Sequence, residues 1–534
     1  METSTFNIKD TSYDCRKTWS LICDGRTKGV FQLESQLGRS WAKRLKPRNI
    51  EELAALSALL RPGCLKAIVD GKSMTQHYVD RKNGHEEASY LDESLKLILE
   101  PTYGVLVYQE QSMRIAQEIA GFNLQQADDL RKAIGKKKAG LMAEIKKTFL
   151  KGCEDVSIVS KEIAEEVFSW IEKSNRYAFN KSHAVSYAVC GYWSAYCKAH
   201  FPLHFYCSYL YHSHGKQDQQ QEVKELISDA KMHDIIVMPP KIDNLKSNFN
   251  IKNGNIYFGI QDVKYIGDSQ VEKVIVGIKE IEKKYNQDIK DISWHRILIN
   301  IADKINSNAM LALISIGALS SDYMITRNRM LYEFETWSSL TKKEKDWIRE
   351  NCDEPKDLFP ERGNKGLETS LHRLAPTKKE GGGTHNSRRK DIVEDLLQLL
   401  KNPPYELEDT PDWIATEEQK YLGASLTYSK IDGCDTGASN TTCKEFLDGR
   451  PGKAVLGVEI VSSREWTIKK GNNKGDVMAF LSVEDSTAPM DSVIVFPEAW
   501  SKNKSLLYPG NTVLLSGKKS SKDTTLIVEK VFQI

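Results

Sequence analysis

Apolar residues recur at helical spacing through most of the first 220 residues. The clearest stretches are 95–121 and 163–171, while 185–205 is rich in Ala, Tyr, Trp and Cys, as expected of a buried helix. Proline and glycine interrupt the pattern at 61–63 and 100–104, where we expect loops. The pattern therefore predicts a mainly helical domain over residues 1–220.

A second unit with one short hairpin is predicted for residues 221–335. Residues 247–251 and 255–258 have alternating patterns and flank Asn253-Gly254, a dipeptide typical of hairpin turns. For 336–390 we expect a helical segment followed by a linker. Residues 360–390 lose apolar periodicity and contain three glycines at 381–383 and the basic run 388–390, which predicts a flexible basic linker.

The pattern of apolar residues changes near the C-terminus of the chain. For residues 391–450 we predict a helical connector. Beyond it, five apolar segments have the length of strands, at 455–458, 478–481, 493–496, 512–515 and 525–528. Their number and length predict a small β-barrel over 451–534.

Composition narrows the class of protein more than its function. The 534 residues are 40% hydrophobic and 28% charged, as in ordinary multidomain globular proteins. No apolar run approaches the roughly 20 residues that span a bilayer, and the polar N-terminus lacks a signal-peptide core. Ten scattered cysteines without a C-x-x-C pair favour reduced thiols over disulfides or a zinc site. We therefore expect a cytoplasmic protein, in the host cytoplasm if the source is viral, without a membrane partner.

Charge is informative only locally. The formal net charge is +2, but residues 128–151 hold eight Lys/Arg against three Asp/Glu. Such a stretch indicates either a phosphate-facing surface or an ordinary solvated helix face. The charge pattern alone favours the solvated face.

Four longer motifs occur in a fixed order along the chain. They are GVFQLES at 29–35 with RPG at 61–63, PTYGVLVYQEQ at 101–111 with DDLRKAIGKKK at 128–138, YAFNKSHA at 177–184 with KAHFP at 198–202, and VED at 483–485 with VFPE at 495–498. Together they resemble the C-family of bacterial replicative DNA polymerases, the DNA polymerase III α subunits. The resemblance continues between the motifs and covers almost everything except the predicted linker.

The resemblance implies a multidomain fold with mainly α-helical fingers, a helix-hairpin-helix module and a C-terminal OB-fold β-barrel. The domains would be fingers at 1–220, the helix-hairpin-helix domain at 221–335, a helical segment and linker at 336–390, a helical connector at 391–450 and the OB domain at 451–534. The hairpin departs from the family pattern, because Tyr265 stands where the family has glycine, although Gly267 is kept.

The fingers motifs imply a nucleotide-binding role for two groups of polar residues. In the family, the fingers supply cations that stabilise negative charge on the triphosphate. The residues expected to bind nucleotide or phosphate are Arg131, Lys132, Lys136, Lys137, Lys138, Asn180, Lys181, Ser182 and His183. Alternatives remain open for several of them: Ser182 could be a helix N-cap, His183 a core histidine, and Tyr187 either a base-stacking or a core residue.

The resemblance also implies two DNA-binding surfaces. In the hairpin, Val263, Lys264, Ile266 and Gly267 would place backbone N–H groups against a duplex phosphate. In the OB domain, Trp466, Lys469, Lys470 and Lys474, which we expect in a loop beside Gly471, would bind single-stranded template. Phe480, Phe496 and Trp500 are further aromatic candidates, although Phe480 and Phe496 could instead be core residues of strands. A weaker expectation concerns Asp357, Leu358 and Phe359, which resemble the apolar end of the family's sliding-clamp peptide, although Pro355 replaces the expected glutamine.

The family's palm is not matched. Its three aspartates hold two magnesium ions and include a D-x-D pair, and no D-x-D occurs in these 534 residues. We therefore expect no catalytic residue and no bound metal in this chain alone, with magnesium held by a palm on a separate polypeptide. The expected partners are that polypeptide, primer–template DNA, a dNTP and a sliding clamp. A split gene of this kind suggests a phage or an unusual bacterium. The alternatives are a polymerase-derived, non-catalytic DNA-binding protein and a truncated remnant.

Overall fold

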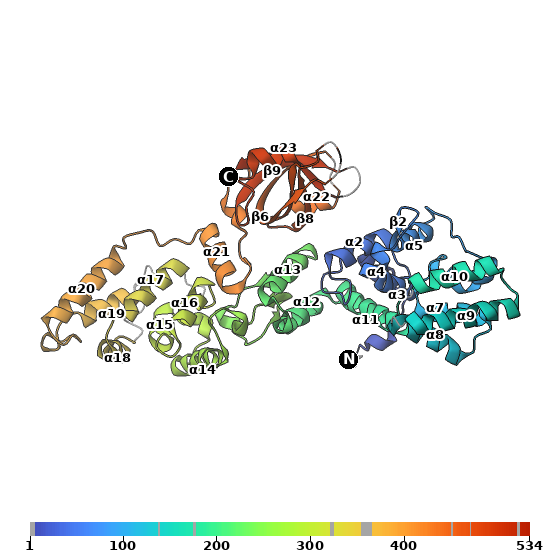
Figure 1. Cartoon of the computed structure of the whole chain (residues 1–534). Coiled ribbons are helices and arrows are strands. Elements are labelled where there is room, and N and C mark those ends of the chain that lie inside the picture. Colours follow the sequence, from blue (N-terminus) through green and yellow to red (C-terminus); the bar gives the residue numbers. More distant parts are fainter. Residues whose placement is uncertain are drawn as a thin grey trace. The chain divides into compact units, whose positions relative to one another are not determined.

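The computed structural model describes residues 6–136, 139–174, 178–320, 325–353, 366–449, 452–469, 471, 473–520 and 524–534, without the side chains of 62, 63, 134–136, 139, 174 and 214 (Figure 1). The chain divides into two compact units, Met1–Phe205 and Tyr206–Ile534. In the described part of the chain, no helix is long and apolar enough to cross a membrane.

Helices dominate the first unit, as predicted. They are α1 (Arg16–Cys23), α2 (Gln36–Leu45), α3 (Ile50–Leu59), α4 (Pro62–Lys66), α5 (Met74–Lys82), α6 (Lys96–Leu99), α7 (Gln109–Ala120), α8 (Leu124–Lys136), α9 (Ala139–Val156), α10 (Lys161–Ser174), α11 (Lys181–His200) and α12 (Pro202–Tyr211), the last of which begins in this unit and ends in the second. One two-stranded ribbon joins β1 (Ile68–Val69) to β2 (Lys72–Ser73).

Two separate hydrophobic cores hold this unit together. In the first, α11 packs along α3 and buries alanines such as Ala184 and Ala188, which confirms the predicted helix over 185–200. The prediction of one helix up to 205 is wrong, because α11 ends at His200 and α12 begins at Pro202. In the second, α7 to α10 surround Phe149 and Phe168. Helices α7 and α9 approach so closely that a Cβ atom on Gly152 would lie 2.1 Å from the Ala120 carbonyl oxygen. The two cation groups predicted to bind phosphate thus belong to different layers: α8 to the second core and α11 to the first.

The second unit contains helices, a small sheet and a barrel. Its helices are α13 (Gln219–Met232), α14 (Asp268–Tyr285), α15 (Trp294–Ile301), α16 (Ser307–Ser315), α17 (Arg327–Ser338), α18 (Lys342–Asn351), α19 (Gly366–Leu374), α20 (Ser387–Lys401), α21 (Pro411–Leu422), α22 (Cys443–Leu447) and α23 (Pro497–Asn503). Its strands are β3 (Val237–Met238), β4 (Asn250–Lys252), β5 (Asn255–Tyr257), β6 (Lys453–Thr467), β7 (Val477–Glu484), β8 (Pro489–Val495), β9 (Thr512–Lys519) and β10 (Leu526–Gln533).

The hairpin predicted around Asn253-Gly254 is confirmed. Strands β4 and β5 pair antiparallel, with Lys252 opposite Asn255. Asn253 and Gly254 have φ values of 51° and 77°, as a tight two-residue hairpin turn requires.

The flexible linker predicted for 360–390 is wrong over residues 366–390. Helix α19 buries Leu367, Leu371 and Leu374, and α20 starts at Ser387. The three glycines form a tight turn in which a Cβ atom on Gly382 would lie 1.9 Å from the Pro376 carbonyl oxygen. Glycine is needed here for close backbone approach, which the sequence pattern alone did not distinguish from flexibility. Residues 360–365 lie outside the described residues.

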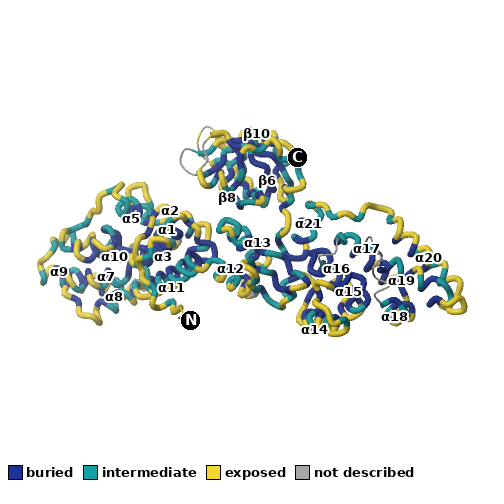
Figure 2. The backbone as a smooth tube through the Cα atoms, turned by 180° about the vertical axis from the view of Figure 1, so that it is seen from behind, coloured by how far each residue is buried: buried dark blue, intermediate teal, exposed yellow. Residues whose placement is uncertain are grey.

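The predicted C-terminal barrel is confirmed. Its strand order is β10-β8-β7-β6-β9, closed, with the β10–β8 pair parallel and the other pairs antiparallel. Helix α23 connects β8 to β9, and the arrangement is that of an OB fold. Figure 2 shows the buried positions inside the barrel, where Leu456, Val493 and Leu515 lie.

Candidate nucleotide and nucleic-acid interface

The N-terminus of α11 holds the predicted donor group in a fixed network. Asn180 is the N-cap, and its Oδ1 accepts hydrogen bonds from the His183 backbone N–H at 2.9 Å and from Ser182 Oγ at 2.7 Å. The Glu110 carboxylate accepts from Asn180 Nδ2 at 2.8 Å and from the Lys181 backbone N–H at 2.9 Å. Glu110 therefore occupies the position that an anion would take at this helix N-terminus. The cap is Asn180 rather than Ser182, because its side chain reaches the N3 amide.

Lys181 keeps a loosely held side chain. Its Nζ lies 3.7 Å from Glu51 Oε1 and 5.8 Å from the centre of the Tyr108 ring, and its side chain is 43% exposed. The cavity beside it, which Glu51, Glu110 and Arg114 also line, has a volume of only about 110 Å³. That is too small for a nucleotide. Any phosphate contact by Lys181 must therefore form on the exposed side of α11.

A ladder of rings runs from Phe179 through His183 and Tyr187 of α11 to Phe31. Ring centres are separated by 5.2 Å from Phe179 to His183, 4.0 Å from His183 to Tyr187 and 5.2 Å from Tyr187 to Phe31. At one end, the Arg61 guanidinium lies 3.7 Å from the centre of the Phe179 ring. We refer to these five residues as the ring ladder.

Exposure distinguishes the ring ladder from core packing. His183 and Arg61 are exposed, Phe31 is 40% exposed, and Phe179 and Tyr187 are half-buried. The alternative of a core histidine at 183 is therefore wrong. Phe179 was missed in the sequence, because it precedes α11 and lies in a β-bridge with Tyr108, whereas His183 and Tyr187, four residues apart, share one face of the helix. Phe31 carries no such local signal, because it is far away in the sequence.

The second predicted cation group is tied to a neighbouring carboxylate. Asp128 Oδ1 lies 2.7 Å from Arg131 Nη2, and Asp128 Oδ2 lies 2.6 Å from Lys132 Nζ. Hydrogen bonds from Lys132 and Arg131 hold the pKa of the Asp128 carboxyl below its ordinary value. Lys137 and Lys138 lie outside the described residues, as does the side chain of Lys136. Among the described side chains, no hydrogen bond or ion pair joins this group to the one at 180–183.

The hairpin of the predicted helix-hairpin-helix module, residues 263–267, leads into α14. Val263 and Ile266 are buried, and the N–H groups of Val263, Lys264 and Ile266 donate to carbonyls within the unit, with Lys264 reaching the Tyr421 oxygen at 2.9 Å. Lys264 and Gly267 are exposed. The expectation that the N–H groups of Val263, Lys264 and Ile266 bind a phosphate is therefore wrong, and the Lys264 and Tyr265 side chains and the N-terminus of α14 face solvent instead.

Tyr265, which stands where the family pattern led us to expect glycine, has a backbone conformation that favours glycine. Its φ is 73°, in the left-handed region, and its side chain is 51% exposed. The Lys264 Nζ lies 5.3 Å from the centre of its ring. A tyrosine with this φ is strained, since a side chain with a Cβ atom disfavours the left-handed region.

An exposed face of the barrel carries aromatic and cationic side chains. Trp466 lies on β6 and is 45% exposed, with Lys469 Nζ 5.4 Å from the centre of its ring. Arg464, which sequence reasoning missed, lies opposite Phe480 of β7, and its guanidinium is 5.6 Å from the centre of the Phe480 ring. The expectation that Trp466 lies in a loop is wrong, because the strand extends to Thr467.

The other barrel residues predicted to bind DNA differ in their exposure to solvent. Trp500 is buried in the barrel core and cannot stack on a base, whereas Phe496 is 45% exposed. Lys474 is exposed. Lys470 lies outside the described residues, as do the predicted clamp-binding residues Asp357, Leu358 and Phe359.

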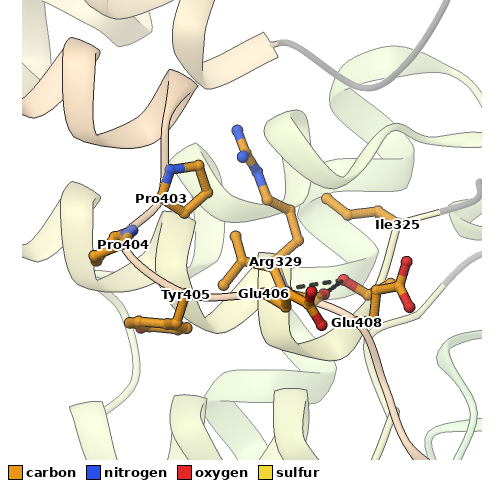
Figure 3. Close-up of a pocket in the computed structure, with 9 residues that line it drawn as sticks. Ile325, Arg329, Pro403, Pro404, Tyr405, Glu406 and Glu408 are labelled. Carbon is orange, nitrogen blue, oxygen red and sulfur yellow. Dashed lines mark hydrogen bonds between the residues drawn. The ribbon is translucent and has the colours of Figure 1, made fainter.

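A pocket of about 700 Å³ in the second unit does not suit a phosphate. Its lining residues are Ile325, Thr326, Arg329, Pro403, Pro404, Tyr405, Glu406, Leu407 and Glu408 (Figure 3). The Arg329 guanidinium points away from the Glu406 and Glu408 carboxylates in Figure 3, and it is engaged by Glu333 and Glu368 at 2.9 and 3.0 Å. The two carboxylates at its rim would repel an anion. Within the part of the chain that the structure describes, no group of three or more His, Cys, Asp or Glu side chains could hold a metal ion.

Comparison with known proteins points to one family. The sequence profile of the bacterial DNA polymerase III alpha subunit finger domain matches residues 1–157. DNA polymerase III subunit alpha of Bacillus subtilis is 31% identical over 518 residues, which cover 97% of this chain and 41% of that protein. The Vibrio cholerae protein of the same name is 37% identical over 537 residues, with 97% and 41% covered. This chain thus spans about two fifths of the length of these relatives.

Proposed function

Because this chain belongs to the family of bacterial DNA polymerase III α subunits over nearly its whole length, we propose that it supplies the fingers, hairpin and OB parts of a replicative DNA polymerase. The reaction is template-directed addition of a dNTP to a primer. The observation that carries the proposal is the exposed ring ladder, on a segment that lies within the region shared with the relatives, with Lys181 in the first turn of the same helix.

The ring ladder offers two kinds of contact to an incoming nucleotide. Tyr187 and Phe31 present apolar ring surface, on which a base can stack at a gain of about 1–3 kcal/mol. Arg61 and His183 are exposed donors within the ring ladder, and Lys181 is a half-exposed donor in the first turn of the same helix. Base and triphosphate would therefore be held by neighbouring side chains on one helix and the loops packed against it.

Charge stabilisation is the chemical role proposed for Lys181 and Arg61. In nucleotidyl transfer, the primer 3′-hydroxyl attacks the α-phosphate and pyrophosphate leaves. Negative charge builds on the phosphate oxygens, and preorganised cations lower the barrier by stabilising that charge. Arg131 and Lys132 would act at a different place, on template or primer phosphates, where a phosphate must compete with Asp128 for them.

Magnesium is the metal that the family implies. The described residues do not fit a two-metal site, so no step is assigned to a metal on this chain. We propose that the magnesium ions are held by palm carboxylates outside these 534 residues, whether on a separate polypeptide or joined to this sequence. The hairpin and the barrel face with Trp466 would hold duplex and single-stranded DNA, respectively.

Nucleotide kinetics test the proposal. In an enzyme reconstituted with a palm-bearing polypeptide, Lys181→Ala should raise the apparent KM for dNTP, or lower kcat, by at least about tenfold, because a hydrogen bond to a charged group contributes about 1.5–3 kcal/mol. Lys181→Arg should restore most of the activity. Arg131→Ala should weaken primer–template binding instead.

The control is Lys161→Ala, which removes an exposed lysine from α10. If Lys181→Ala behaves like Lys161→Ala, Lys181 does not contact nucleotide. If Lys181→Ala, Tyr187→Ala and Arg61→Ala all leave the kinetics unchanged, the ring ladder is not the nucleotide site and the proposal fails.

A further inference from the structure

A basic concavity lies apart from the ring ladder in the first unit. Its volume is about 740 Å³, and its lining comes from the C-terminal ends of α2 and α5 and the turns that follow them. The side chains of Lys43, Arg44, Lys46 and Arg48 line it and are exposed. Between Ser35 and Ile50 the chain has five Lys/Arg and no Asp/Glu, a local signal that the neutral composition conceals.

The carboxylates nearest this concavity are already engaged. Asp80 accepts from Lys72 Nζ at 2.8 Å and from Gln76 Nε2 at 2.5 Å, and these hydrogen bonds lower its pKa despite partial burial. Glu52 accepts from the Arg48 backbone N–H at 2.8 Å and lies 3.4 Å from Lys82 Nζ. Among the described residues, no ion pair joins a carboxylate to Lys43, Arg44, Lys46 or Arg48.

Helix ends do not explain these cations either. Free carbonyls at a helix C-terminus attract cations, but here other groups satisfy the end of α2. Lys82 Nζ donates to the Leu45 and Lys46 carbonyls at 2.9 and 2.6 Å, and Asn83 Nδ2 donates to the Arg44 carbonyl at 2.9 Å. Lys46 is the C-cap of α2 and has a left-handed backbone with φ 52°. The four cations thus remain directed to solvent.

One of them is held in place. The Arg44 guanidinium lies 4.0 Å from the centre of the Trp41 ring, and it donates a hydrogen bond to the neutral Gln76 side chain. An arginine stacked on an indole loses little side-chain entropy when its remaining N–H groups bind an anion. The concavity is therefore partly preorganised for phosphate.

We propose that this concavity binds phosphates of the DNA backbone, as a contact surface additional to the ring ladder, the hairpin and the barrel face. Val79 is the one aliphatic side chain of the lining, and the Trp41 ring is covered by Arg44, so the lining offers cations rather than apolar surface. Four exposed cations without an enclosed cradle suit successive backbone phosphates rather than one nucleotide. The inference rests on the proposed function only in taking DNA as the polyanion.

Salt dependence of DNA binding by the full chain tests it. The variant carries Lys43→Gln, Lys46→Asn and Arg48→Gln, with asparagine at 46 because it tolerates the left-handed backbone. A matched control removes two lysines and one arginine of similar exposure elsewhere in the unit: Arg16→Gln, Lys161→Gln and Lys173→Gln. Binding of a labelled 20-base-pair duplex is measured by fluorescence anisotropy at several KCl concentrations.

The test variant should flatten the slope of log Kd against log[KCl] by about 2 to 3 and weaken binding at about 0.1 M KCl at least tenfold, since each neutralised phosphate contributes about 0.9 to that slope. A conservative triple, Lys43→Arg, Lys46→Arg and Arg48→Lys, should bind like the parent chain. Equal slopes for the test and control triples would overturn the inference and leave the proposed function standing, because nucleotide kinetics test that function independently. Competition by micromolar tripolyphosphate would also overturn it, by assigning the concavity to small polyphosphates.

Discussion

At the scale of single residues, partners decide what each charge can do. The predicted donors Asn180 and Lys181 share one carboxylate, Glu110, which uses the amide and the first helical N–H but leaves the lysine ammonium accessible. Arg131 and Lys132 share another, Asp128. Two residue groups that look alike in sequence therefore differ in how readily a phosphate can reach them.

Glu333 should make stability depend on pH. It is buried, accepts from Trp294 Nε1 at 3.0 Å and Arg329 Nε at 2.9 Å, and burial raises the pKa of its carboxyl to about 7 despite these contacts. The folded state thus keeps a proton that the unfolded state loses above about pH 4.5. The free energy of unfolding should therefore fall as pH rises from 4.5 to 7, by up to about 3 kcal/mol.

Urea unfolding followed by tryptophan fluorescence at pH 5 and pH 8 measures the free energy of unfolding at both pH values. Glu333→Gln should reduce the difference between the two pH values, whereas Glu335→Gln, an exposed carboxyl on the same helix, should leave it unchanged. An undiminished pH difference in Glu333→Gln would show that Glu333 is ionised in the folded protein throughout this range.

Tyr265 should be a site of backbone strain. Because its φ is 73°, Tyr265→Gly should be more stable than Tyr265→Ala by about 1 kcal/mol. At Lys273, an exposed position inside α14, the order should reverse, with glycine less stable than alanine by about 1 kcal/mol. Thermal unfolding of the four variants makes the comparison. The same order at both positions would contradict the strained conformation.

At the scale of elements, β6 differs from the other barrel strands. It is 15 residues long, whereas β7 to β10 have 7 or 8. Its first half, 453–459, pairs with β9, and its second half pairs with β7 alone after a bulge between Ile460 and Ser462. The exposed aromatic and cationic side chains lie on this second half. The strand thus builds the barrel with one half and presents a surface with the other.

Trp466 should contribute to single-stranded DNA binding through that surface. Replacing it with alanine removes one stacking platform, for which we expect a loss of about 1–3 kcal/mol, or roughly 5- to 150-fold in affinity for a short oligothymidine. Phe532→Ala is the control, because Phe532 is 49% exposed on β10. Fluorescence anisotropy with labelled oligothymidine measures both. Equal affinities for the two variants would remove Trp466 from the binding surface.

At the scale of the whole molecule, the charge is nearly balanced although the candidate surfaces are basic. The net charge of +2 hides the acid-free run 35–50 and the basic stretch 128–151. Association with DNA should therefore depend on local fields, which salt screens within about 10 Å at 0.1 M.

Primer extension tests the whole-molecule proposal. These 534 residues alone should hold primer–template DNA but should not extend the primer with magnesium or manganese, because no group of three or more His, Cys, Asp or Glu side chains among the described residues could hold the metal ions. Adding a palm-bearing polypeptide should give extension. Robust synthesis by this chain alone, surviving repurification, would refute the dependence on a palm. DNA binding without extension in the presence of a functional palm would favour a non-catalytic DNA-binding protein.

The sequence by itself determined the elements whose signals are local. Helical spacing predicted the α-rich first unit, Asn253-Gly254 predicted the hairpin, and five apolar segments predicted the barrel, because periodicity and turn chemistry depend on residues within a few positions of one another. The order of the motifs was likewise enough to indicate the family.

Only the tertiary structure decided which side chains meet. Phe31 joins the ring ladder from about 150 residues away, and the ends of α2 and α5 form one basic concavity although some 30 residues separate them. The glycines at 381–383, which were predicted to belong to a flexible linker, form a tight turn that packs against Pro376. Contacts of this kind depend on how the helices pack, and packing involves residues whose separation in the sequence carries no periodic signal.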